Sequence, residues 1–152
     1  MRLAPAILPL AICLLGSASA ETPAQVCARQ HTDDATRPVP ASFVTAINRL
    51  FAMNMTDDIA VATTVYRCMD GHVLVCTTGA NLPCGKANTA RTSAGAAEWC
   101  QGNPNADFVP AYAAGHDTIY LWRCRNGTPD VVGQTSAVDQ RGFVAAYWRR
   151  LK

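Results

Sequence analysis

Hydrophobic residues fall into one long run at the N-terminus and several shorter, periodic segments further along the chain. The run Leu3–Leu15 follows a single positive charge, Arg2, and leads into the small residues Ala18-Ser19-Ala20. A short positive region, an apolar core and an Ala-x-Ala exit are typical of a cleavable secretory signal. A membrane-spanning helix needs about 20 apolar residues, whereas this run is shorter and contains two prolines. We therefore expect residues 1–20 to be a signal peptide, removed before Glu21.

Helical periodicity marks two internal segments and the C-terminus. Apolar residues recur at helical spacing over residues 43–53, and Ser42 can cap the start, so a helix is predicted there. Residues 93–101 are predicted as a second, shorter helix. A third apolar stripe follows Asp139, which can cap a last helix. Gly142 weakens that helix, so a terminal strand remains open.

Two further segments have the alternating, β-branched and aromatic composition of strands around a tight turn. The predicted hairpins are Val61–Cys68 and Val73–Val75 around Asp70-Gly71, and Thr118–Cys124 and Val131-Val132 around Asn126-Gly127. Residues 66–71 and 122–127 share the pattern aromatic, Arg, Cys, any residue, Asp or Asn, Gly. We interpret this short likeness as common turn chemistry, with an old duplication as the alternative.

These elements predict an α+β fold, with an antiparallel sheet of two hairpins covered by two or three helices. Residues 21–40 contain three prolines and are expected to be an extended lead-in. Residues 41–152 are expected to form a single domain, because a mature chain of this length fits one hydrophobic core.

Cysteine usage predicts a disulfide framework. Seven cysteines become six once Cys13 leaves with the signal peptide, and an even number in an exported chain favours three bridges. No C-x-x-C spacing or finger-like histidine spacing is present, so we expect no bound metal and no cofactor. The six predicted bridging residues are Cys27, Cys68, Cys76, Cys84, Cys100 and Cys124.

Charge excludes one class of partner. The mature chain has twelve Lys and Arg against eleven Asp and Glu, with no long basic run, so we expect no nucleic-acid partner. No second apolar stretch has the length of a membrane span, so none is expected after signal cleavage. Export and bridged cysteines together predict a periplasmic or secreted location.

Candidate catalytic residues are sparse. The sequence has no nucleophile elbow, zinc-protease motif or phosphate loop. His116-Asp117 is the one pair that suggests a base with an orienting carboxylate, although neighbouring residues of a strand point to opposite faces. A turn that enters the strand at Thr118 is the interpretation that we favour for this pair.

The second hairpin offers a candidate binding surface. Tyr120, Trp122 and Cys124 alternate onto one face of the predicted strand, and Arg123 points to the other. Arg125 lies beside the Asn126-Gly127 turn. Aromatic residues and arginine are enriched at interfaces, so Trp122, Arg123 and Arg125 are the predicted binding residues. Packing of Trp122 in the core is the alternative.

Two stretches, residues 79–86 and 115–124, resemble small uncharacterised exported proteins of Gram-negative bacteria. The resemblance covers roughly residues 60–150 and implies no catalytic residues. Tyr66-x-Cys68-x-x-Gly71 is more weakly similar to periplasmic inhibitors of animal-type lysozyme, and no inhibitory residue is carried over from them.

The sequence thus predicts a non-catalytic binding or interaction module of the cell envelope, with an unknown envelope or extracellular partner. A small secreted hydrolase that uses His116 and Asp117 is the alternative. A purely structural envelope protein is a third interpretation that sequence does not separate from the first.

Overall fold

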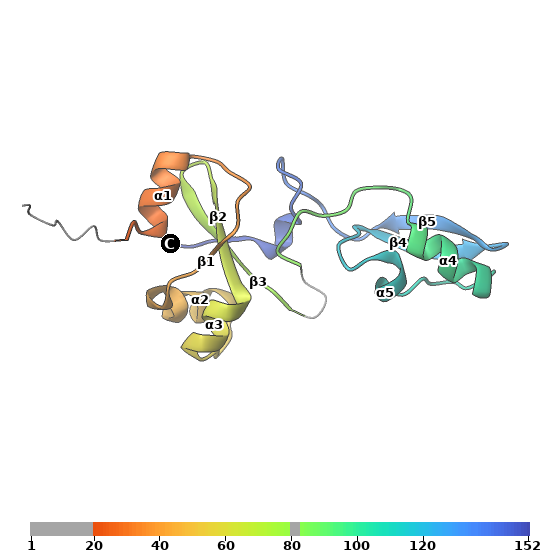
Figure 1. Ribbon diagram of the computed structural model, residues 1–152, viewed down its shortest axis with the longest axis horizontal. Helices are drawn as coiled ribbons and strands as arrows, with labels where there is room; N and C mark the ends of the chain where they lie inside the picture. The colour runs from red at the N-terminus through yellow and green to blue at the C-terminus, as the bar shows by residue number, and fades with distance from the viewer. Residues whose placement is uncertain (1–19, 80–82) are drawn as a thin grey trace, which may run out of the picture.

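The computed structural model describes residues 20–79 and 83–152 and arranges them as two lobes joined by a narrower middle part (Figure 1). Residues 1–19 of the predicted signal peptide, and residues 80–82 of the chain, lie outside the described residues. The described residues form five α-helices and antiparallel sheets of four and two strands, which confirms the α+β class. The two predicted hairpins lie in different sheets.

The first lobe contains three helices around a four-stranded sheet with the order β1-β2-β3-β6, in which each neighbouring pair is antiparallel. Its core joins α1, α2 and one face of β2 and β3. Its elements are α1 (Pro23–Gln30), β1 (Arg37–Pro38), the 3₁₀ turn η1 (Ala41–Phe43), α2 (Val44–Phe51), α3 (Asp57–Thr63), β2 (Thr64–Met69), β3 (His72–Thr77) and β6 (Arg149–Arg150).

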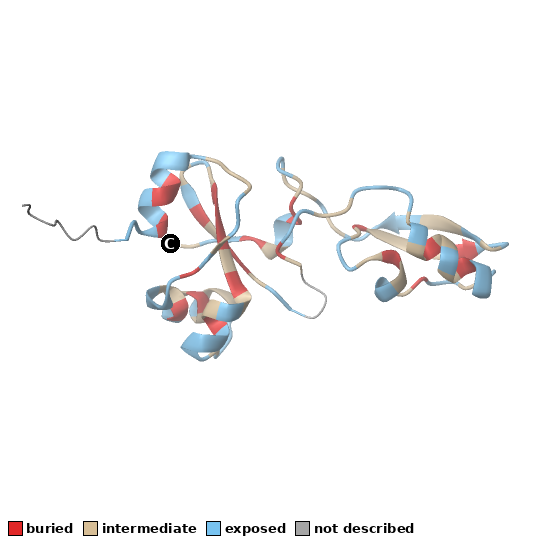
Figure 2. Ribbon diagram, in the orientation of Figure 1, coloured by how far each residue is buried: buried red, intermediate tan, exposed pale blue. Residues whose placement is uncertain are grey.

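The second lobe is a β-hairpin with two helices packed on it, and it has a separate core (Figure 2). Residues 137–152, the C-terminal segment, return from this lobe to the first and end in β6. The remaining elements are α4 (Ala94–Gly102), α5 (Ala111–Ala114), β4 (Tyr120–Arg125), β5 (Thr128–Gln134) and the 3₁₀ turn η2 (Ala145–Tyr147).

The predicted helices over residues 43–53 and 93–101 correspond to α2 and α4. Ser93 caps α4 by accepting a hydrogen bond from the Ala96 amide. Ser42 does not cap α2, because the chain already turns through η1 before that helix begins. The strand predicted from Val61 begins only at Thr64, since α3 continues through Thr63.

The expectation of an extended lead-in over residues 21–40 was wrong for α1. Pro23 occupies the first turn of this helix, where its missing N–H costs no hydrogen bond. Thr22 and Gln25 form a capping box: the Thr22 hydroxyl accepts from the Gln25 amide, and the Gln25 side chain accepts from the Thr22 amide. The proline therefore starts a helix rather than preventing one.

The C-terminal helix predicted after Asp139 was also wrong. Asp139 Oδ1 accepts hydrogen bonds from the amides of Arg141 and Phe143, which forms a tight turn instead of a helix cap. Gly142 in this turn has φ 85°, a left-handed conformation that suits glycine. The chain then makes η2 and joins the sheet as the short strand β6, so the strand alternative holds there.

All six predicted cysteines are paired. The bridges are Cys27–Cys68, Cys76–Cys84 and Cys100–Cys124. The first links α1 to β2, and the third links α4 to β4, so each lobe has a helix fastened to its hairpin. Bridges of this kind persist in oxidising compartments.

The likeness between the two hairpins extends beyond turn chemistry. Both turns are left-handed at two consecutive residues, Asp70-Gly71 at φ 52° and 76° and Asn126-Gly127 at φ 48° and 77°. This is the backbone of a type I′ turn, which matches the twist of the strands. Each hairpin also carries a cysteine, Cys68 or Cys124, bridged to the helix that lies before it in the chain.

The loop after each helix meets its hairpin turn in the same way. The Gly71 amide donates to the carbonyl of His31 at 2.9 Å, four residues after Cys27. The Gly127 amide donates to the carbonyl of Pro104 at 2.9 Å, four residues after Cys100. The next side chains, Thr32 and Asn105, accept from the amides of Asp70 and Asn126.

Further along, each loop reaches a buried valine before a proline, Val39-Pro40 and Val109-Pro110, at the start of the next helical turn. We therefore interpret the lobes as two versions of one unit of helix, loop and hairpin.

Candidate binding surface

Trp122, one of the three predicted binding residues, lies in the core of the second lobe. Its side chain is buried with Cys100, Cys124, Ala96 and Val109, and its indole N–H donates to Thr118 Oγ1 at 3.3 Å. Tyr120 contacts it edge-on. Trp122 therefore stabilises the hairpin from the core, and its side chain is not available to a binding partner.

Arg123 and Arg125 lie on the opposite, outer face of the same hairpin and share one carboxylate. Arg123 donates to Asp130 Oδ2 at 2.8 Å, and Arg125 Nε lies 3.4 Å from the same oxygen. Their side chains are 35% and 65% exposed, so both guanidinium groups reach solvent. The structure thus places the two arginines together, apart from Trp122.

His116 and Asp117 are both exposed, at the entrance to β4. His116 lines a shallow hollow of about 190 Å³, together with Phe108, Tyr120 and Tyr147. Within the described residues no hydrogen bond joins the His116 and Asp117 side chains, and no three His, Cys, Asp or Glu side chains are grouped as metal ligands.

The middle of the molecule holds a buried cation that sequence analysis did not single out. Arg67 on β2 has no solvent exposure and forms an ion pair with Asp139 of the C-terminal segment. Its guanidinium carbon lies 4.2 Å from the ring centre of Phe143 and 4.6 Å from that of Trp148. These two rings and the carboxylate fix the C-terminal segment over the outer face of β2–β3.

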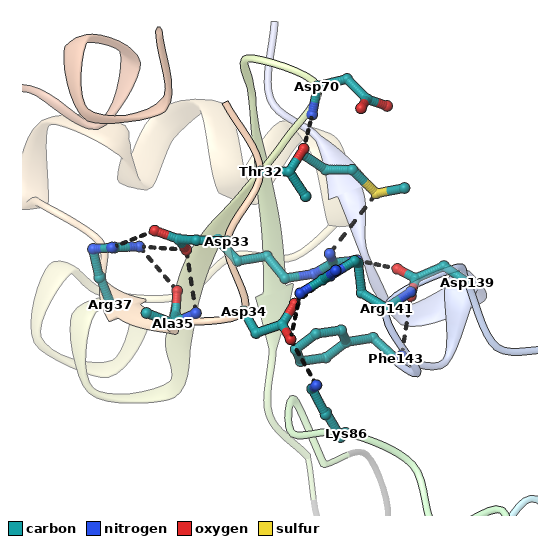
Figure 3. Close-up of polar contacts among 12 residues, drawn as sticks. Thr32, Asp33, Asp34, Ala35, Arg37, Asp70, Lys86, Asp139, Arg141 and Phe143 are labelled. Carbon is teal, nitrogen blue, oxygen red and sulfur yellow. Dashed lines mark hydrogen bonds and ion pairs between the residues drawn. The ribbon is translucent and has the colours of Figure 1, made fainter. Parts of the chain in front are cut away.

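A second, exposed ion cluster lies beside this site (Figure 3). Arg141 donates to Asp34 Oδ1 at 2.7 Å and to Oδ2 at 2.9 Å, and Lys86 Nζ lies 2.6 Å from the same Oδ2. The hydrogen bond from Arg141 and then that from Lys86 lower the pKa of Asp34 to about 2. Asp34 thereby ties together three parts of the chain that are distant in sequence.

We expect the contribution of Asp34 to stability to disappear in acid. Its pKa is lower in the folded protein than the ordinary value of about 3.9, so its ion pairs stabilise the fold above that pH and are lost as pH falls towards about 2. The measurement is the urea midpoint of the wild type and of Asp34→Asn between neutral pH and about pH 2. The difference should shrink below about pH 4; a difference that is constant with pH would contradict this assignment.

Aromatic side chains of α4, α5 and the segment between them line two hollows of the second lobe. We define the half-buried Trp99 and the exposed Phe108 and Tyr112 together as its aromatic surface. Phe108 and Tyr112 are 54% and 75% exposed, and they are the two aromatic side chains among the exposed large hydrophobics of the described residues. Trp99 and Tyr112 line one hollow of about 340 Å³. Phe108 lines the neighbouring hollow that contains His116.

This aromatic surface has a rigid support. The Val109 amide, next to Phe108, donates to the Trp122 carbonyl at 2.8 Å, and the Ser93 hydroxyl donates to the Ala114 carbonyl at the end of α5. A Cβ at Gly95 would lie 2.2 Å from the Ala113 carbonyl oxygen, so glycine lets α4 and α5 approach closely. The aromatic rings are therefore held on an ordered backbone.

Sequence analysis missed these aromatics for a physical reason. Phe108 and Tyr112 stand in the turn-rich segment after α4, where no helical or strand periodicity assigns a face. The available signal was the repeated Val-Pro-Ala of residues 39–41 and 109–111, which marks a buried valine and a helical turn in both lobes.

Comparison of the chain with protein families, with curated proteins and with solved structures finds no match. Within residues 20–79 and 83–152, none of the helices has the length and apolar character that crossing a membrane requires.

Proposed function

We propose that this chain is a non-catalytic binding module of the cell envelope, periplasmic or secreted, which captures a partner protein on the aromatic surface of its second lobe. The observation that carries the proposal is the joint exposure of Phe108 and Tyr112 on a rigid backbone. Aromatic residues are enriched at interfaces and dominate their binding energies. A preorganised surface also loses less conformational entropy on binding.

Charge around the surface indicates the kind of partner. Glu98 lines the hollow beside Trp99 and Tyr112, Asp107 precedes Phe108, and Asp117 follows His116. All three acids are exposed, and within the described residues none takes part in an ion pair. An apolar patch with a free acidic rim fits a partner whose contact surface is apolar and basic.

The hydrolase that uses His116 and Asp117 is the alternative. General base catalysis needs a base within hydrogen-bonding reach of the proton that it removes, with the imidazole oriented by a partner. Both side chains are exposed. Within residues 20–79 and 83–152, no carboxylate or carbonyl accepts a hydrogen bond from the His116 ring to orient it. The binding interpretation does not require any residue that orients His116.

The expected result is that Phe108→Ser with Tyr112→Ser abolishes partner capture and leaves the fold intact. Each truncation at a true hot spot costs about 2 kcal/mol or more, so the double variant should lose well over a hundredfold in affinity. The measurement is quantitative pull-down from envelope extract by the purified mature protein, with the partner then titrated.

The matched control is Met53→Ser with Ile59→Ser, which removes two apolar side chains of similar exposure from the first lobe. This control should capture the partner as the wild type does. An equal loss of partner capture in both double variants would contradict the assignment of the binding surface to the second lobe. An activity in a substrate screen that disappears in His116→Ala would overturn the proposal itself.

A further inference from the structure

The two lobes differ in what covers the outer face of their hairpins. In the first, Arg67 stands opposite Leu74 on this face; in the second, Arg123 stands opposite Asp130. The positions correspond, because each arginine precedes the bridged cysteine and lies four residues before the turn glycine. The outer hairpin face of the first lobe, which another segment of the chain buries, can therefore be compared with the same face of the second lobe, which is more exposed.

The outer face of β2–β3 is buried by the chain itself. Residues 139–148 pack the rings of Phe143 and Trp148, which meet edge to face, against Arg67 and supply the carboxylate of Asp139, and Arg67 has no exposure. Val65 and Leu74 pack against these rings, beside the Cys76–Cys84 bridge. This face of the unit is thus built to receive an aromatic segment that carries an acid.

Among residues 20–79 and 83–152, no segment buries the corresponding face of β4–β5 near its turn as residues 139–148 bury that of β2–β3. Arg123 and Arg125 are 35% and 65% exposed. Val132, the extra residue of a β-bulge in β5 opposite Leu121 and Trp122, is 48% exposed. Two guanidinium groups share the single carboxylate of Asp130, which leaves one positive charge in excess. An apolar side chain and an unneutralised arginine on a rigid hairpin match the surface that the first lobe covers.

We propose that this outer hairpin face, defined by Arg123, Arg125 and Val132, docks a partner segment that carries an aromatic residue and an acid. The aromatic ring makes a cation–π contact with Arg123, as Phe143 and Trp148 do with Arg67. The acid pairs with Arg125, because Asp130 already neutralises Arg123. This face is opposite the side of the hairpin that packs against α4, so it is separate from the aromatic surface proposed above.

The test is selection of a random peptide library, displayed on phage, on the immobilised mature protein. Enriched peptides should contain Phe, Tyr or Trp with Asp or Glu a few residues away. Arg123→Gln, Arg125→Gln and Val132→Ser should each weaken a selected peptide at least about tenfold. Arg123→Lys should weaken it too, because an ammonium lacks the planar face that stacks on a ring.

Two controls separate this proposal from the proposed function. Arg29→Gln removes an exposed arginine of α1 that pairs with Glu21, and it should leave peptide binding unchanged. Tyr112→Ser should also leave it unchanged. Peptides without aromatic and acidic residues, or peptides that bind Arg123→Gln and Val132→Ser as tightly as the wild type, would overturn the proposal. Denaturant midpoints close to the wild type confirm that each variant is folded.

Discussion

Replacing Asp139 with asparagine should destabilise the folded protein by about 3–5 kcal/mol, because it leaves the Arg67 charge buried without a counter-ion. Arg67 has no solvent exposure, and its Nε already lacks a hydrogen-bond partner within the described residues. Asparagine can still accept the two backbone hydrogen bonds that form the turn, so the change isolates the charge. Urea unfolding at neutral pH measures the loss.

The double variant Arg67→Met with Asp139→Asn is the control for this prediction. Removing both members of a buried ion pair is often far less costly than removing one. The double variant should therefore be more stable than Asp139→Asn alone. A loss of under about 1 kcal/mol for Asp139→Asn, as for an exposed pair, would show that the pair is not buried in solution.

Trp122→Ala should cost about 3–5 kcal/mol, because it empties the centre of the second lobe. Its side chain is 2% exposed and packs against the Cys100–Cys124 bridge. Tyr112→Ala is the matched control, since this side chain is 75% exposed and its removal should change stability by less than about 0.5 kcal/mol.

Denaturant midpoints of the two variants measure this contrast. Equal midpoints for Trp122→Ala and Tyr112→Ala would contradict the position of Trp122 in the core.

Local signals in the sequence predicted the parts of the fold that local chemistry determines. Asp70-Gly71 and Asn126-Gly127 adopt φ values that asparagine, aspartate and glycine tolerate, so both hairpin turns were predictable. The apolar stripe of α2 and the short helix over residues 93–101 were predicted in the same way. The even cysteine count left after the expected loss of Cys13 predicted the bridges, although not which residues pair.

Features that depend on distant contacts were not predictable from one sequence. The helical spacing after Asp139 gave way to a turn and a strand because Phe143 and Trp148 pack on Arg67, which lies 76 and 81 residues earlier in the chain. Sequence gives no sign of which arginine is covered: Arg67 and Arg123 stand in the same local pattern, yet Arg67 is fully buried and the Arg123 side chain is 35% exposed. The difference lies in the segment that packs against each.

The candidate binding surface was also predictable only where local sequence patterns determine it. Alternation along β4 correctly separated Trp122 from Arg123, and Trp122 lies in the core, the alternative given for it. Phe108 and Tyr112 could not be found by periodicity, because their exposure follows from how α5 docks on α4.

The central claim, that the second lobe binds a partner on its α4–α5 side, is tested most directly by photo-crosslinking in living cells. A photoreactive phenylalanine analogue replaces Tyr112 in one version of the full-length protein and Ile59, 50% exposed on the first lobe, in the other. We predict one discrete crosslinked adduct from position 112 and none from position 59. No adduct from position 112, or the same adducts from both positions, would contradict the account.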